Sequence, residues 1–84
     1  MDIVYHPKFK KEYRKLPARI KNLAEKKEVI FRKNPFDRRL KTHKLHGELA
    51  TFYAWAINAQ YRIMFDFAPD GTARFYFVGT HDVY

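Results

Sequence analysis

The chain has 84 residues, which is room for a single domain spanning 1–84 and lies near the lower end of sizes that fold without disulfides or metals. It contains no cysteine, which excludes disulfides and thiolate zinc sites, so its eight Phe, six Tyr and one Trp have to supply the core. A formal net charge of +8 predicts a polyanionic partner, namely RNA, DNA or an acidic protein.

The first half of the chain predicts a short strand followed by two helices. Residues 1–5 are apolar and β-prone, and Pro7 then opens a helix whose apolar residues recur at helical spacing. Pro17 ends that helix and opens a second one, which keeps the helical period through about Lys33. Lys27 falls on the apolar stripe of the second helix, and we expect its stem to lie along the edge of the core with the ammonium in water.

A basic loop separates the predicted helices from the predicted strands. Residues 34–37 break the helical period, and residues 38–47 are rich in Lys and Arg and contain His43 and His46. Loops carried on a rigid scaffold are favoured places for binding and catalytic groups. The two histidines have no cluster of Asp or Glu beside them, so we expect no metal site.

From Glu48 onward the apolar period changes to two, which predicts a three-stranded antiparallel meander. A two-residue turn at Asn58 and Ala59 would close the first hairpin and pair Trp55 with Arg62. In the same register Tyr53 pairs with Met64, Ala54 with Ile63 and Phe52 with Phe65.

The last predicted strand begins at Ala73, where an Asp66–Arg74 pair of opposite charges supports the register. That register sets Phe65 against Phe75 and Met64 against Tyr76. The fold class is therefore α+β, with an N-terminal strand, a two-helix hairpin and the meander, and with both helices packed on one face of the sheet. The face toward the helices is predicted to carry Phe52, Ile63, Phe65, Phe75 and Phe77, and the uncovered face Tyr53, Trp55, Arg62, Met64, Arg74 and Tyr76.

The uncovered face interleaves aromatic rings with arginines, which fits nucleic acid because bases stack on rings and phosphates meet cations. Trp55 and Arg74 are accordingly candidate RNA-binding residues. Two other interpretations fit the same residues: a face covered by a partner protein, or a cation–π pair of Arg62 over Trp55.

The chain has no Gly-rich phosphate loop, no serine in an elbow motif and no close pair of carboxylates, which leaves His, Lys, Arg and Tyr for catalysis. These suffice for RNA cleavage by the 2′-hydroxyl without metal or cofactor: one group takes the 2′-OH proton, another protonates the leaving 5′-oxygen, and cations stabilise the phosphate. Val78 is expected opposite Arg62, so that His81 would leave the sheet beside it. Because no long apolar run or signal-peptide pattern occurs, we expect a cytoplasmic protein with no membrane partner.

Four segments resemble the RelE/ParE superfamily of bacterial toxin–antitoxin toxins, and the RelE and YafQ branch most of all. They are NPFD at 34–37, KTHKLHG at 41–47, YRIMF at 61–65 and GTHDVY at 79–84. The resemblance covers nearly the whole chain and implies a RelE-like fold. It also implies a ribosome-dependent endoribonuclease that cuts mRNA in the A site of the 70S ribosome, inhibits translation, and is silenced by a cognate antitoxin in a hetero-oligomer.

The resemblance also implies roles for individual residues. Arg62 corresponds to the phosphate-stabilising arginine, His81 to a C-terminal proton-transfer histidine and His43 to a loop histidine, with Lys44 as the alternative to His43. Lys41 stands where RelE uses loop lysines and is expected to bind RNA. Tyr84 resembles the terminal aromatic residue that packs against a base.

Departures from the family pattern keep two alternatives open. Ala56 and Gln60 stand where YafQ carries a second histidine and an aspartate, so its acid–base scheme does not transfer whole. ParE-like relatives keep the fold without RNase residues and act on DNA gyrase, although they normally lack the loop and terminal histidines. A catalytically inactive RelE-fold binding module is the second alternative.

Overall fold

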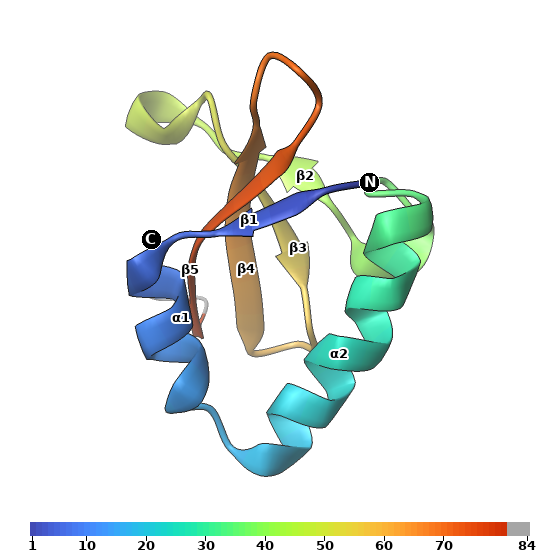
Figure 1. The fold of residues 1–84 in the computed structure, drawn as a ribbon, viewed down its shortest axis with the longest axis vertical. Coiled ribbons are helices and arrows are strands. Elements are labelled where there is room, and N and C mark those ends of the chain that lie inside the picture. The colour runs from blue at the N-terminus through green and yellow to red at the C-terminus, as the bar shows by residue number, and fades with distance from the viewer. Residues whose placement is uncertain (81–84) are drawn as a thin grey trace.

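The computed structural model describes residues 1–80 and has the predicted α+β architecture, with two helices packed on one face of a sheet (Figure 1). The five strands lie in the order β1-β5-β4-β3-β2, in which β1 is parallel to β5 and every other neighbouring pair is antiparallel. The elements are β1 (Ile3–Tyr5), α1 (Pro7–Arg14), α2 (Ala18–Lys33), β2 (His43–Lys44), β3 (Tyr53–Ala56), β4 (Tyr61–Phe67) and β5 (Ala73–Thr80), with short 3₁₀ turns η1 (Arg38–Leu40) and η2 (Gly47–Leu49).

The two prolines predicted to open the helices do so. Pro7 is the first residue of α1, where a missing N–H costs nothing, and the His6 ring accepts a hydrogen bond from the Lys8 N–H at 3.2 Å. Pro17 directly precedes α2. A carboxylate then ties α1 to the sheet, because Glu12 Oε1 accepts the backbone N–H of Val78 at 3.2 Å.

The main core lies between the helices and the sheet. Phe31 of α2 is fully buried and contacts three aromatic rings of the sheet, with centroid distances of 5.8 Å to Trp55, 5.0 Å to Phe65 and 5.2 Å to Phe75. Phe9 of α1 packs against Phe75 at 5.5 Å. We call this side of the sheet the helix face.

The predicted register of the β3–β4 hairpin is wrong by one residue. The observed pairs are Tyr53–Phe65, Ala54–Met64, Trp55–Ile63 and Ala56–Arg62. The turn is longer than two residues, because the Ile57 N–H donates to the Tyr61 carbonyl at 2.9 Å and the Asn58 side chain accepts the N–H groups of Gln60 and Tyr61 at 2.9 and 2.8 Å. This shift turns Tyr53 and Trp55 toward the helix face and leaves the small Ala54 and Ala56 on the other side.

The β4–β5 register is confirmed only at its first three pairs, Phe67–Ala73, Asp66–Arg74 and Phe65–Phe75. A bulge between Met64 and Phe65 then pairs Met64 with Phe77 instead of Tyr76. Beyond the bulge Arg62 lies opposite Gly79, not Val78.

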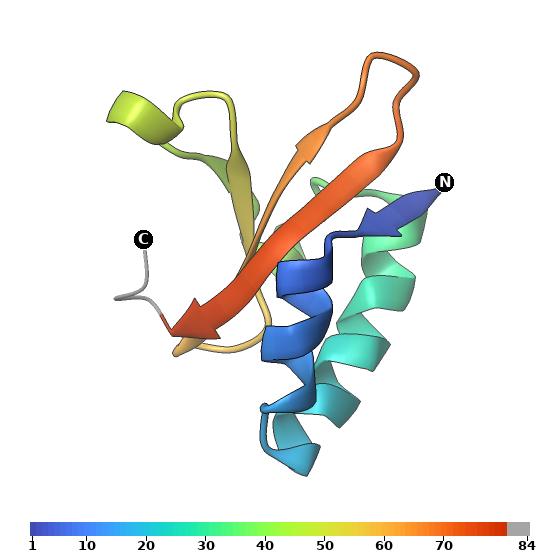
Figure 2. The same ribbon diagram turned by 60° about the vertical axis from the view of Figure 1, so that its left-hand side comes forward.

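The second side of the sheet, which we call the open face, is partly covered by a small apolar cluster. The segment predicted to continue a strand from Glu48 instead forms the turn η2, which lies on the side of the sheet away from the helices (Figure 2). It is anchored by the Leu45 N–H, which donates to the Phe52 carbonyl at 2.9 Å. Phe52 and Phe77, predicted on the helix face, belong to this cluster, which contains Leu45, Ala54, Met64 and Phe77 with Leu49, Phe52 and Tyr76 around them.

Candidate functional site

Arg62 stands on the open face near the start of β4, between Ala56 of β3 and Gly79 of β5. Its Nη1 donates to two backbone carbonyls, that of Asn58 at 2.6 Å and that of Tyr61 at 3.3 Å. No carboxylate within residues 1–80 forms an ion pair with it. The turn thus holds one edge of the guanidinium, and Nε and Nη2, which have no partner in the described part of the chain, are suited to donate to an anion.

Lys27 reaches the same end of the sheet from α2. Its ammonium donates to the carbonyls of Ala56 and Arg39, at 3.4 and 3.5 Å, and the residue is partly exposed. Burial lowers the pKa of Lys27, and the positive charges of Lys41 and Arg62 lower it further. Lys41 and Arg62 therefore each lie close enough to Lys27 to repel its charge.

The loop that carries Lys41 and His43 is held by its own backbone. Lys41 follows η1 with φ at 52°, a left-handed conformation that is uncommon for a residue other than glycine. His43 Nδ1 lies 3.1 Å from the Lys41 carbonyl. Because a carbonyl only accepts, this contact requires Nδ1 to carry the proton, which makes Nε2 of the neutral ring a proton acceptor.

The register of β2 separates the two basic candidates of the loop. His43 pairs with Ala54, so its position belongs to the open face, as that of Arg62 does. Lys44 pairs with Tyr53, whose ring belongs to the core on the helix face. The structure therefore brings His43, and not Lys44, to the face of Arg62.

The prediction that Trp55 binds RNA is wrong. Trp55 is 0% exposed, and its ring stacks on Phe31 in the main core. Its position on the helix face also rules out the cation–π pair with Arg62. The sequence misplaced Trp55 because a shift of one residue in a hairpin exchanges the two faces.

Arg74 lies on the open face as predicted, but it already forms an ion pair with an acidic neighbour. Its Nε and Nη2 donate to the two carboxylate oxygens of Asp66, at 2.7 and 2.8 Å. Tyr76 donates to the same carboxylate at 3.3 Å, and burial followed by the charge of Asp66 raises the pKa of Tyr76. An RNA phosphate would have to compete with Asp66 for Arg74.

Two of the predicted site residues, His81 and Tyr84, lie outside the described residues. Among residues 1–80, no group of three or more His, Asp or Glu side chains could hold a metal ion. None of the described helices is long and apolar enough to cross a membrane.

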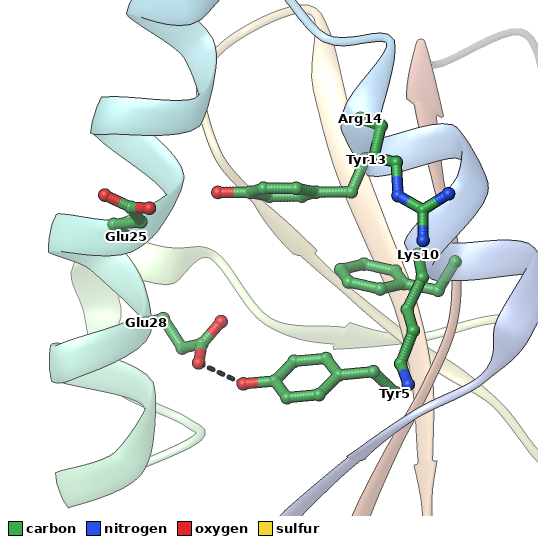
Figure 3. Close-up of a pocket in the computed structure, with 7 residues that line it drawn as sticks. Tyr5, Lys10, Tyr13, Arg14, Glu25 and Glu28 are labelled. Atoms are coloured by element: carbon green, nitrogen blue, oxygen red, sulfur yellow. Dashed lines mark hydrogen bonds between the residues drawn. The ribbon is translucent and has the colours of Figure 1, made fainter.

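A cleft of about 410 Å³ between α1 and α2 contains none of the predicted site residues (Figure 3). The Tyr5 hydroxyl donates to Glu28 Oε2 at 2.5 Å across its floor. Burial first, and then the Glu28 carboxylate, raise the pKa of Tyr5 to about 12. The cleft is lined by Tyr5, Phe9, Lys10, Tyr13, Arg14, Glu25 and Glu28.

Comparison with solved structures finds matches over nearly the whole chain. The YoeB/ParE toxin from Agrobacterium tumefaciens matches with a TM-score of 0.81 at 19% identity, over 96% of this chain and 99% of that one. YafQ from E. coli strain BL21(DE3) matches with a TM-score of 0.78 at 21% identity, over 95% and 92% of the two chains. The archaeal RelE–RelB complex from Pyrococcus horikoshii OT3 matches with a TM-score of 0.77 at 16% identity, over 99% and 97%.

The sequence itself matches no family model and no curated protein. The likeness is therefore one of three-dimensional structure, and it covers 95–99% of this chain in these three matches. This chain has the fold of the RelE/ParE toxins, as its sequence motifs predicted.

Proposed function

We propose that the protein is the toxin of a type II toxin–antitoxin system and cleaves mRNA without a metal ion. The observation that carries the proposal is Arg62, whose Nε and Nη2 have no hydrogen-bond partner among residues 1–80 while the turn holds Nη1. A partly exposed guanidinium in a fixed orientation is suited to the negative charge that develops on a phosphate under attack.

The proposed reaction is transfer of the phosphate to the neighbouring 2′-oxygen. The 2′-oxygen attacks phosphorus, the bond from phosphorus to the 5′-oxygen breaks, and the products are a 2′,3′-cyclic phosphate and a 5′-hydroxyl. His43 is the proposed base, because its Nδ1 contact leaves Nε2 free to take the 2′-OH proton. His81 is the proposed acid that protonates the leaving 5′-oxygen, and Tyr84 is proposed to pack against a base.

The proposed partners follow the same likeness. The archaeal RelE structure is a complex with RelB, and we propose that this chain likewise forms a hetero-oligomer with a cognate antitoxin in the cytoplasm. The net charge of +8 favours both an acidic antitoxin segment and RNA. The proposed substrate is mRNA in the ribosomal A site, where Lys41 contacts the backbone.

Induced expression in bacteria, with cleavage sites in a reporter mRNA mapped by primer extension, tests this proposal. We expect growth arrest and mRNA cleavage by the parent protein, and the loss of both in Arg62→Ala. Arg19→Ala is the matched control, because Arg19 is an exposed arginine on α2 and its loss changes the net charge equally. An Arg62→Ala protein that cleaves as well as the Arg19→Ala protein contradicts the site.

One observation favours a second candidate, inhibition of DNA gyrase as in ParE toxins. Both residues that β3 contributes to the open face, Ala54 and Ala56, are alanines, so β3 supplies no group for proton transfer there. A supercoiling assay with purified gyrase separates the candidates. Inhibited supercoiling with intact mRNA supports the second candidate, and cleaved mRNA with normal supercoiling supports the first.

A further inference from the structure

Two cations from other parts of the chain lie near Lys27 where α2 passes the end of β3, since its ammonium contacts the carbonyl of Arg39, two residues before Lys41, and that of Ala56, which pairs with Arg62. Lys27 comes from α2, Lys41 from the loop after η1, and Arg62 from β4. The Lys27 ammonium lies 3.4 Å from the carbonyl of Ala56, the residue that pairs with Arg62. Sequence separations of at least 14 residues between these positions mean that the fold, and not a local charge run, produces the cluster.

No acidic side chain within residues 1–80 neutralises this cluster. The ion pairs there join Arg32 to Glu28, Arg39 to Asp37 and Arg74 to Asp66. Bringing like charges together in a partly buried site costs free energy, and the pKa of Lys27 is lowered first by burial and then by the charges of Lys41 and Arg62. A bound anion would attract all three cations and so offset their repulsion.

The partners of Lys27 also leave it able to bind a ligand. An ammonium has three donors, and the contacts of Lys27 to Ala56 and Arg39 are long for hydrogen bonds, at 3.4 and 3.5 Å. The neighbouring strand β3 has no cation of its own to bind an anion beside Arg62, because its residues on the open face are Ala54 and Ala56. Lys27 therefore adds positive charge from α2 beside Ala56, the residue that pairs with Arg62.

We propose that Lys27, together with Lys41, binds a phosphate of a single-stranded RNA backbone that crosses the open face at Arg62. The choice of RNA as the ligand rests on the proposed function, but the binding itself requires no cleavage. Lys27 is thus a phosphate ligand contributed by the helical layer, whereas the sequence pattern makes it a lysine at the edge of the core.

Binding of a single-stranded 2′-O-methyl RNA oligonucleotide tests this inference, because the methyl group blocks the 2′-oxygen and prevents cleavage. Fluorescence anisotropy at several salt concentrations gives the affinity and its salt dependence for the wild type, Lys27→Met and Lys26→Met. Methionine keeps the apolar stem and removes the charge. Lys26 is the matched control, because it is exposed on the same helix and its loss changes the net charge equally.

We expect Lys27→Met to weaken binding severalfold and to reduce the slope of log K against log salt by about 0.7, the value for one phosphate contact on a single strand. Lys26→Met should leave the slope unchanged. Equal slopes in the wild type and both variants overturn the inference, as does a wild type that does not bind the oligonucleotide. A Lys27→Met protein that unfolds more easily but keeps the wild-type slope also overturns it, because Lys27 then only caps carbonyls.

Lysine acetylation of the wild-type protein, located by mass spectrometry, gives a test that needs no variant. The oligonucleotide should protect Lys27 and Lys41 from acetylation more than Lys26, and equal protection of all three overturns the inference. The two proposals fail separately. Intact mRNA with a slope that depends on Lys27 refutes only the cleavage reaction, and cleaved mRNA with an unchanged slope refutes only the role of Lys27.

Discussion

Replacement of Trp55 tests the register of the β3–β4 hairpin, on which the assignment of every open-face residue depends. Trp55 is fully buried against Phe31, so Trp55→Ala should reduce the free energy of unfolding by about 3–5 kcal/mol. A tryptophan on the open face, as in the alternative register, would be a surface residue whose loss changes stability by roughly 0.5 kcal/mol or less.

Trp55→Phe gives the matched control, and its expected effect is much smaller. The lost ring atoms and the cavity that they leave cost roughly 1–3 kcal/mol. The indole Nε1 is buried without a hydrogen-bond partner among residues 1–80, and removing such a donor recovers about 1–3 kcal/mol of desolvation penalty. The two effects oppose each other, so the free energy of unfolding should change by about 1 kcal/mol or less.

Urea unfolding followed by far-UV circular dichroism measures both variants, because each one lacks the single tryptophan that fluorescence would report. The affinity of Trp55→Phe for the 2′-O-methyl oligonucleotide should equal that of the wild type. A Trp55→Ala protein that is as stable as the wild type, or a Trp55→Phe protein that has lost RNA affinity, would refute the observed register.

Three further substitutions test other parts of the structure. Tyr5→Phe removes a hydroxyl whose pKa is raised from 10.0 to about 12, so its stabilising contact with Glu28 is complete below about pH 10 and is lost as the pH rises through about 12. The difference in Tm between the wild type and Tyr5→Phe should therefore shrink over that range, and a constant difference contradicts the contact. Asp66→Asn should cost about 1 kcal/mol or less in urea unfolding, because Arg74 is partly exposed, and should strengthen oligonucleotide binding by releasing Arg74. Weaker binding would show that Asp66 does not keep Arg74 from the oligonucleotide. Asn58→Ala removes the acceptor of two turn hydrogen bonds and should lower stability by about 1–2 kcal/mol in thermal unfolding, whereas an unchanged Tm contradicts the turn as described.

The sequence predicted the elements well where local chemistry decides them. Pro7 and Pro17 define the starts of both helices, because proline is favoured at the first helical turn and disfavoured inside a helix. The Asp66–Arg74 pair fixed the start of the β4–β5 register, because opposite charges across two strands leave few other pairings.

Face assignment failed where the pattern allowed two answers. Both faces of β3 are apolar, so alternation alone does not tell the side of Trp55 from that of Ala54. The length of the turn decides between them, and the turn is held by the Asn58 side chain and by the backbone hydrogen bond from Ile57 to Tyr61. The bulge beside Met64 is equally hard to predict, because three consecutive aromatic residues, 75–77, do not tell which of them is the extra one.

The candidate site was predicted unevenly for a related reason. Arg62 follows from the strand pattern and the family motif, and His43 from the motif alone. Lys27 was visible as a lysine on an apolar stripe, but its ammonium meets carbonyls from two distant segments. Such contacts between residues distant in sequence are set by the packing of α2 on the sheet, and a local sequence pattern does not predict that packing.

The chemistry of the RNA ends tests the central claim most directly. Purified protein is added to ribosomes translating a defined mRNA, and the 5′ ends of the fragments are tested for labelling by polynucleotide kinase with and without prior phosphatase treatment. Attack by the 2′-hydroxyl predicts 5′-hydroxyl ends, which are labelled without phosphatase, for the wild type and none for Arg62→Ala. Intact mRNA, or fragments with 5′-phosphate ends, would contradict the account.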